Sequence, residues 1–374
     1  MVTAIKPLYY SGMNQEIELK LRLNPRDLPL LEQALAQTAA SAQPTLQFLN
    51  RYYDTPTMAL SAGGAALRIR QQNRDGNNPQ IIQTLKTRGT SVGGLHQRME
   101  WDWPLTQLDL NLDLIENSDA RHHLSPTLDL TTIGALFTTD FQRKMWLYQL
   151  GDSEIEVVLD QGQVATDQHC VDLLELELEL IRGDAEQLFK LAHSIAQYCP
   201  VVMSDVSKAE RGYGLLALSE SYQNIKKDWQ DSLPILNPSQ TAVDAFKTFF
   251  SYQLSLCQRS LETAIWDQQP SYLGNAKLQL QRLHDLLSGF TYISALPAAE
   301  PLKSLLGQAT VFDLSPAEVA ETTGSGISLL WGQLTLSCGH FLYQLHDNQL
   351  PASISHSELL ALQQYVEQIS KGMR

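Results

Sequence analysis

The sequence has few cysteines, no long apolar run and less basic than acidic charge. Its 4 cysteines lie far apart and form no Cys-x-x-Cys pair, which excludes a zinc site of that type and favours free thiols. No segment approaches the roughly 18 consecutive apolar residues of a membrane-spanning helix. Residues 1–12 have no long apolar core, so they do not resemble a secretory signal. These absences predict a cytoplasmic protein with no membrane partner.

Positive charge is scarce for a nucleic-acid-binding protein. The 374 residues include 27 Lys and Arg against 41 Asp and Glu, which gives a formal net charge of −14. Binding to a duplex needs a positively charged face, so we expect no nucleic-acid partner. An acidic chain is better suited to a metal ion. The 43% apolar and 18% charged fractions are typical of a globular protein, and the length accommodates two domains.

The hydrophobic period changes along the chain. Alternation of period two dominates from Gln15 to about Arg182, whereas a helical period begins near Thr241. The polar segment 219–240 between them is broken by prolines and is interpreted as a linker. The predicted strands are Gln15–Leu23, Gln47–Asp54, Ala65–Gln71, Gln80–Lys86, His96–Trp103, Phe141–Leu150, Glu154–Asp160 and Val171–Ile181.

Helical patterns are few in the first part and dominate the second. The predicted helices are Pro25–Ala40, Ala185–Tyr198, Thr241–Trp266, Asn275–Ser294, Pro316–Thr323, Ile327–His346 and Ser355–Gly372. The first part shows no regular strand–helix alternation, so we expect an antiparallel sheet, curled or closed. The fold class is therefore α+β, with a closed antiparallel barrel and flanking helices followed by an all-α bundle.

Charged residues occupy alternate positions of several predicted strands. Alternate side chains of a strand share a face, so Glu16, Glu18, Lys20 and Arg22 point the same way. A solvated outer face is the simplest interpretation of one such strand. The same alternation recurs on further strands at Arg68 with Arg70, Lys86, Arg98 with Glu100, Glu154 with Glu156 and Asp160, and Glu175 with Glu177 and Glu179.

Some of these strands carry acids on the recurring face and others carry bases. If the face lined the inside of a barrel, it would present a carboxylate cluster on one side and a cluster of Arg and Lys on the other. Carboxylates without Cys or His suit a hard ion such as Mg²⁺ or Mn²⁺. Guanidinium and ammonium groups suit phosphate oxygens. The pattern therefore predicts a charged lumen for a polyanionic phosphate chain, with aliphatic residues packing outward against helices.

Several of these segments resemble motifs of the CYTH superfamily, the triphosphate tunnel metalloenzymes. Glu16-Ile17-Glu18-Leu19-Lys20 matches the ExExK signature, and the segments 50–56, 67–70, 84–86 and 175–179 follow in family order. Longer strings at 93–98, 139–141, 159–162 and 207–213 resemble the bacterial inorganic triphosphatases that carry a C-terminal CHAD domain. The resemblance implies an N-terminal extension at 1–12, because Met13 would place ExExK near an initiator, a CYTH tunnel domain at 13–218, the linker at 219–240 and a degenerate or truncated CHAD-like domain at 241–374.

The resemblance also implies a role for each charged residue. The expected metal ligands, for Mg²⁺ or Mn²⁺, are Glu16, Glu18, Glu175, Glu177 and Glu179. The expected ligands of the phosphate chain are Lys20, Arg68, Arg70, Lys86, Arg98, Arg143 and Lys208. Lys20, Asp160 and Lys208 are expected to be catalytic, and Glu100 is expected to position a cation. Relatives often carry a Lys where this chain has Met145, and Lys144 lies on the opposite face.

The expected function is metal-dependent hydrolysis of inorganic triphosphate to pyrophosphate and phosphate. The alternatives are adenylate cyclase or thiamine-triphosphatase activity in the same tunnel, or a non-catalytic polyphosphate-binding module. In residues 219–374 acidic residues outnumber basic ones, so the helical part is expected to bind polyphosphate poorly. All assigned residues precede residue 219, which predicts that the helical part is dispensable for chemistry.

Overall fold

The computed structural model describes residues 15–36, 41–73, 79–87, 89–216, 234, 241–267, 269–311 and 329–347. Within them 11 strands form one sheet. The strands are β1 (Gln15–Arg22), β2 (Ser41–Ala42), β3 (Leu46–Asp54), β4 (Ala66–Asn73), β5 (Gln80–Lys86), β6 (Thr90–Val92), β7 (Leu95–Leu105), β8 (Gly134–Leu150), β9 (Ser153–Ala165), β10 (Cys170–Arg182) and β11 (Val202–Met203).

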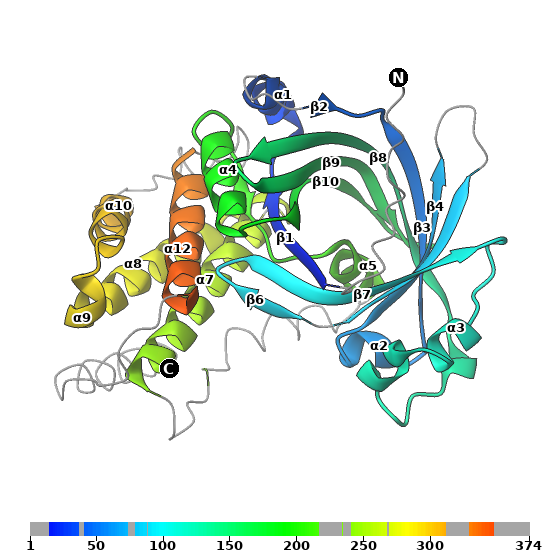
Figure 1. Cartoon of the computed structure of the whole chain (residues 1–374). Coiled ribbons are helices and arrows are strands. Elements are labelled where there is room, and N and C mark those ends of the chain that lie inside the picture. Colours follow the sequence, from blue (N-terminus) through cyan, green and yellow to red (C-terminus); the bar gives the residue numbers. More distant parts are fainter. Residues whose placement is uncertain are drawn as a thin grey trace.

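Eight of these strands close into a barrel. Their order is β1-β10-β9-β8-β3-β4-β5-β7, and β7 pairs back onto β1 to complete the ring. Every pairing in the ring is antiparallel. Figure 1 shows the barrel beside a group of helices from the second part of the chain. The α+β fold class with a closed barrel is thus confirmed.

The hairpin between β8 and β9 has a two-residue connection. Leu150 pairs with Ser153, and Gly151 between them has a φ of 59°, a left-handed conformation that favours glycine. Both strands extend beyond the predicted ends: β8 begins at Gly134 rather than at Phe141, and β9 continues to Ala165 rather than to Asp160. The additional residues pair in register with each other, so long-range pairing sets these ends.

Several helices lie on one side of the barrel, some against its sheet and others mainly against helices. They are α1 (Leu28–Ala36), α4 (Glu186–Ala196), α7 (Ala242–Ile265), α8 (Tyr272–Gly289), α9 (Thr291–Ser294), α10 (Ala299–Val311) and α12 (Leu329–Asp347). Two short helices, α2 (Ala59–Ala62) and α3 (Asp113–Glu116), lie at another side of the barrel in Figure 1. Finally, α5 (Lys208–Leu216) packs against β8 and β9.

The aliphatic face of the strands points outward, as predicted. Leu19 and Leu21 of β1 and Leu176 of β10 are fully buried, and they share one hydrophobic cluster with residues of the helices. Phe246 of α7 and Leu342 of α12 belong to the same cluster. The barrel and the helical part are therefore joined by a common core rather than only by a connecting segment.

Some expectations lie outside the described residues. These are the extension at 1–12, almost all of the linker at 219–240, and the helices at Pro316–Thr323 and Ser355–Gly372. In the described part of the chain, α5 and α10 and the short α2 and α3 were not predicted, whereas α7 and α12 agree with prediction to within two residues. All 4 cysteines are free thiols. Among the described helices, none has the length and apolarity needed to cross a membrane.

Candidate active site in the barrel lumen

The lumen of the barrel contains a charged cavity of about 490 Å³. All eight strands of the ring contribute to its lining, and the first residues of α5 close part of it. The expected site residues that line the cavity are Glu16, Glu18, Lys20, Arg68, Arg70, Lys86, Arg98, Glu100, Arg143, Glu177, Glu179 and Lys208. Asp160 and Glu175 are fully buried and lie against Lys208. The alternating positions of the sequence therefore converge on one lumen.

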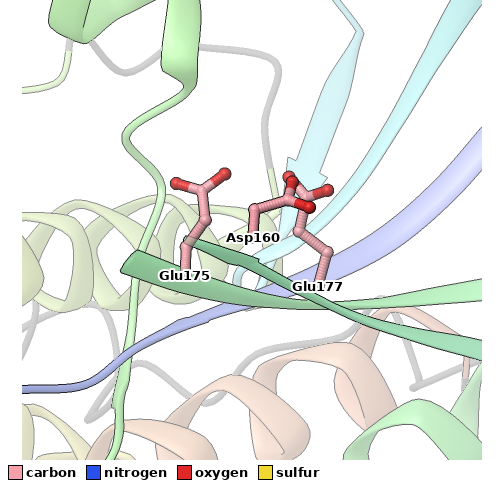
Figure 2. Close-up of side chains that lie close together, drawn as sticks. All are labelled: Asp160, Glu175 and Glu177. Atoms are coloured by element: carbon pink, nitrogen blue, oxygen red, sulfur yellow. The ribbon is translucent and has the colours of Figure 1, made fainter. Parts of the chain in front are cut away.

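Three carboxylates form a compact cluster that could hold a metal ion. Asp160 is the pairing partner of Glu175 across β9 and β10, and Glu177 follows on the same face of β10. One oxygen of each carboxylate lies within 4.8 Å of the others. Figure 2 shows the three side chains rising from the two neighbouring strands. One oxygen of Glu175, Oε2, is buried and accepts no hydrogen bond.

Three cations surround this acidic cluster. Lys208 Nζ lies 2.7 Å from Asp160 Oδ2 and 3.1 Å from Glu177 Oε1, and it also donates to Glu175. Lys20 Nζ lies 3.1 Å from Glu177 Oε1. Arg143 donates two hydrogen bonds of 2.7 Å to Asp160, which fixes the guanidinium as a fork.

Burial and neighbouring charges have opposite effects on the pKa values of Lys208 and Glu177. Burial alone lowers the pKa of the Lys208 ammonium, but the adjacent carboxylates outweigh it and raise that pKa. Burial likewise raises the pKa of the Glu177 carboxyl, and Lys208, Lys20 and Arg143 overcome this and hold the pKa well below its usual range. Lys208 and Glu177 therefore stay charged near neutral pH.

A second ionic cluster joins β1 to β5 and β7. Glu16 pairs with Arg98 across β1 and β7, and Lys86 pairs with Glu100 across β5 and β7. Lys86 Nζ donates to both oxygens of Glu16, at 2.9 and 2.8 Å, and lies 2.9 Å from Glu100 Oε2. Arg98 donates to Glu16 at 2.7 Å and to Glu18 at 2.6 Å.

Acids and bases are grouped by strand inside the barrel, with exceptions that include Lys20 and Glu100. Most acids stand on the neighbouring strands β1, β10 and β9, whereas most bases stand on β8, β4, β5 and β7. Antiparallel register brings the two groups into direct pairs where they meet, as at Arg143 opposite Asp160 and Arg98 opposite Glu16. Such pairing lowers the cost of burying charge in the lumen.

Arg70 has less compensating charge than the other cations. Burial lowers its pKa to about 10, and the like charges of Arg68 and Arg143 act in the same direction. Its Nε donates to Asn50 Oδ1 at 2.9 Å, and its guanidinium lies 4.7 Å from the centre of the Phe48 ring. The region around Arg70 is therefore the part of the lumen in which an anion would relieve most repulsion.

Two carboxyl groups of the lumen have pKa values that are raised rather than lowered. Burial raises the pKa of Glu179 well above its usual range, and Glu16 and Glu156 add to the effect. Burial also raises the pKa of Glu156, which is paired with Glu179 across β9 and β10. Glu179 lies outside the three-carboxylate cluster. Glu156 was not among the predicted site residues, although it shares the parity of Asp160 on the same strand.

The position of Lys208 depends on how α5 is anchored. Tyr213 of α5 donates a hydrogen bond of 2.9 Å to the buried Asp54, which also accepts from backbone amides at the start of α2. Gly212 packs so closely on Phe137 of β8 that a Cβ there would lie 2.0 Å from the ring. The segment 50–56 thus supports the site indirectly, through Arg70 and through α5.

Met145 takes the place in the lumen where relatives often carry a Lys, and Lys144 lies on the opposite face of β8, as predicted. Met145 lines the cavity, whereas Lys144 is exposed and lies 2.8 Å from Glu32 on α1. No bulge rotates Lys144 into the lumen, so this chain lacks that cation.

The comparisons with known proteins agree with this geometry. The CYTH domain family matches residues 14–213. The chain belongs to the CYTH family. The inorganic triphosphatase of Haemophilus influenzae is 34% identical over 255 residues, which cover 68% of this chain and 69% of that protein. The CHAD-like character of residues 241–374 stays a prediction, because the family match ends before them.

Two solved structures are also similar to this chain. One is a putative adenylyl cyclase from Hippeastrum described as having a dominant triphosphatase activity, with 22% identity, a TM-score of 0.40, and coverage of 55% of this chain and 99% of that one. The other is a Pyrococcus horikoshii protein with 17% identity, a TM-score of 0.38, and coverage of 54% and 99%.

Proposed function

We propose that this chain hydrolyses inorganic triphosphate to pyrophosphate and phosphate inside the barrel. The observation that carries the proposal is the lumen itself, in which guanidinium and ammonium groups from several strands converge beside a cluster of three carboxylates. Membership of the CYTH family and the similarity to an inorganic triphosphatase support the same substrate class.

The phosphate chain is bound by the cations of the lumen. Arg68 and Arg70 stand on one strand, and further cations face them from other walls, so several phosphoryl groups can be contacted at once. The residues assigned to this role are Lys20, Arg68, Arg70, Lys86, Arg98, Arg143 and Lys208. Glu100 holds Lys86 and Arg68 in place from 2.9 and 3.7 Å. Orthophosphate would engage fewer of these groups than triphosphate.

The acidic cluster suits a divalent ion. Asp160, Glu175 and Glu177 offer only oxygen ligands, which hard ions such as Mg²⁺ or Mn²⁺ prefer, and Glu175 Oε2 has no hydrogen-bond partner. When bound, the ion would supply Lewis-acid stabilisation of phosphate charge. The other acids expected as ligands, Glu16, Glu18 and Glu179, face the same lumen and remain candidates for a further ion.

The residues of the chain stabilise charge as the phosphoanhydride bond breaks. Lys208 and Lys20 place their ammonium groups beside the acidic cluster, where they can neutralise negative charge that develops on phosphate oxygens. Asp160 holds the fork of Arg143 in one orientation. A preorganised lumen of this kind needs little rearrangement when the substrate reacts.

Phosphate release from inorganic triphosphate, ATP and thiamine triphosphate tests the proposal. With Mg²⁺ or Mn²⁺ present, triphosphate should give the highest kcat/KM, and a chelator should abolish turnover. Cyclic AMP formation from ATP or preferred hydrolysis of thiamine triphosphate would favour the alternative enzyme activities. Binding of polyphosphate without any hydrolysis would instead indicate a non-catalytic module.

A further inference from the structure

The helix α7 lies against one end of the lumen and carries a buried acid there. Glu262 of α7 is 7% exposed, although it belongs to the helical part of the chain. It accepts hydrogen bonds from Arg22 of β1 and from Ser204, and it lies 3.7 Å from Arg211 of α5. A second cavity, of about 1150 Å³, is lined by Arg22, Arg211 and Glu262 and shares Lys86 with the lumen cavity.

Arg211 connects Glu262 to the acidic cluster. Its NH2 lies 3.6 Å from Glu175 Oε2, while its NH1 lies 3.7 Å from Glu262 Oε2. The carboxylate of Glu175 is fully buried, so its orientation is set by such neighbours. Two ion pairs in series therefore run from α7 to a proposed metal ligand.

A second residue of α7 holds the segment that carries Lys208. Arg259 lies one helical turn before Glu262, and its Nε is 3.1 Å from Asp205 Oδ1. It also donates to Glu210 of α5. Lys208 lies between these two acids in the sequence. Arg259 of α7 therefore forms ion pairs with the chain on both sides of Lys208.

The ion pairs keep Glu262 charged. Burial alone would raise its pKa, but Arg22 and Arg211 outweigh burial and lower that pKa to about 2. Removing the charge would take this counter-charge away from Arg22 and Arg211, which is costly in a buried network.

We propose that Glu262 is a positioning residue of the tunnel, which holds Arg211 so that the Glu175 carboxylate is correctly placed for a divalent ion. The catalytic role of Glu262 rests on the proposed function. Its effect on the Glu175 carboxylate can be tested without turnover, by metal binding. This positioning role also makes the helical part of the chain a contributor to the site, in contrast to the dispensable role expected from the sequence.

The test is Mn²⁺ binding to the full chain, measured by calorimetry and by electron paramagnetic resonance. Glu262→Gln keeps the size of the side chain and removes its charge. It should weaken Mn²⁺ binding about tenfold, the lower end of the effect typical for residues that orient metal ligands. In the activity assay, the Mn²⁺ concentration for half-maximal rate should rise by a similar factor, with KM for triphosphate at saturating metal nearly unchanged.

Two control variants separate positioning from stability. Glu300→Gln makes the same chemical change at an exposed residue of α10, and Leu342→Ala removes apolar contacts from the common core without touching the ion pairs. Both should bind Mn²⁺ as the unmodified protein does, even where Leu342→Ala lowers Tm. If Glu262→Gln does not fold, Glu262→Asp retains the charge at shorter reach and should show a smaller loss.

The outcomes are distinguishable from failure of the proposed function. Unchanged Mn²⁺ affinity in the folded Glu262 variant would overturn the inference, and so would an equal loss in Leu342→Ala. If the unmodified chain does not hydrolyse triphosphate, yet its Mn²⁺ binding depends on Glu262, the proposed function fails while the positioning role stands.

Discussion

Individual cations of the lumen differ in how fully the protein compensates their charge. Lys208 lies among three carboxylates, and Arg143 is held by a bidentate contact with Asp160. Arg70 instead has an amide as its hydrogen-bond partner and two other arginines whose charge lowers its pKa. A cation in this state gains more from an incoming phosphate than a cation that must first leave a carboxylate.

Replacement of Arg70 should therefore harm substrate binding strongly. Arg70→Ala is expected to cost at least ~2 kcal/mol in kcat/KM for triphosphate, about 30-fold, because a charge-assisted contact is lost. Steady-state kinetics measure this directly. Lys144→Ala is a matched control, since Lys144 lies outside the lumen and should leave kcat/KM unchanged. Indifference to Arg70 would show that the substrate does not reach this wall.

Replacement of Glu177 should abolish turnover while the fold is retained. Glu177→Gln removes one charge from the acidic cluster with little change in volume, and leaves Lys20 and Lys208 less compensated. Circular dichroism should show an unchanged barrel, and Mn²⁺ titration should show lost affinity. Glu18→Gln probes the second ionic cluster in the same way. Normal rates at both limiting and saturating Mg²⁺ in both variants would contradict the assignment of the acidic residues.

Parity along the strands predicted most of the residues that enter the lumen, although Arg22 and Glu154 share this parity and do not line it. Glu16, Lys20 and Arg68 could be placed on one face without any knowledge of strand order, because side chains of a strand alternate. The pairing of acids with bases could not be predicted, since it depends on register. The contact between Arg22 and Glu262 spans 240 positions of the sequence, and no local pattern indicates it.

At the scale of elements, local signals account for the start of α7 and for the failure to predict α10. Thr241 and Asp244 form a capping box at the start of α7, and this helix was predicted almost to the residue. In α10, Pro301 obscured the helical pattern. It is the third residue of the helix, within the first turn, where a missing amide hydrogen costs little. A proline in the first turn is therefore compatible with the helix, whereas a proline further along it would not be.

The contact between α7 and the barrel should make stability depend on pH through Glu262. Its pKa is about 2 in the folded chain, below the usual 4.5, so its stabilising contribution is present above about pH 4.5 and is lost as pH falls toward 2. The contribution is on the order of 3 kcal/mol at neutral pH. Urea unfolding at several pH values should show Glu262→Gln less stable at pH 7, with the difference shrinking below pH 4. A difference that is constant with pH would contradict the charged state of Glu262.

At the scale of the whole molecule, the change of period near residue 220 correctly separates strands from helices but does not separate two independent cores. The outward leucines of β1 and β10 belong to one hydrophobic cluster with residues of the helical part, and α7 and α12 pack directly on β11. Composition cannot reveal this, because an aliphatic strand face has the same sequence whether it is covered by a helix of the same domain or by a distant one. The hydrophobic period therefore changes near residue 219, but the hydrophobic core continues across this position.

This packing changes the expected result of truncation. A chain that ends near Ser219 would uncover Val202 and Met203 of β11, which are now fully buried and lie against α7 and α12, and would leave Arg211 without Glu262. Exposed apolar surface of this kind promotes aggregation. We therefore expect the truncated chain to have a lower Tm, reduced solubility and weaker Mn²⁺ binding than the full chain. Thermal unfolding, calorimetry and phosphate release on both chains measure these three properties. Full activity and unchanged Mn²⁺ affinity in a soluble truncated chain would restore the original expectation, because the tunnel would then hold Glu175 and Lys208 in place without α7.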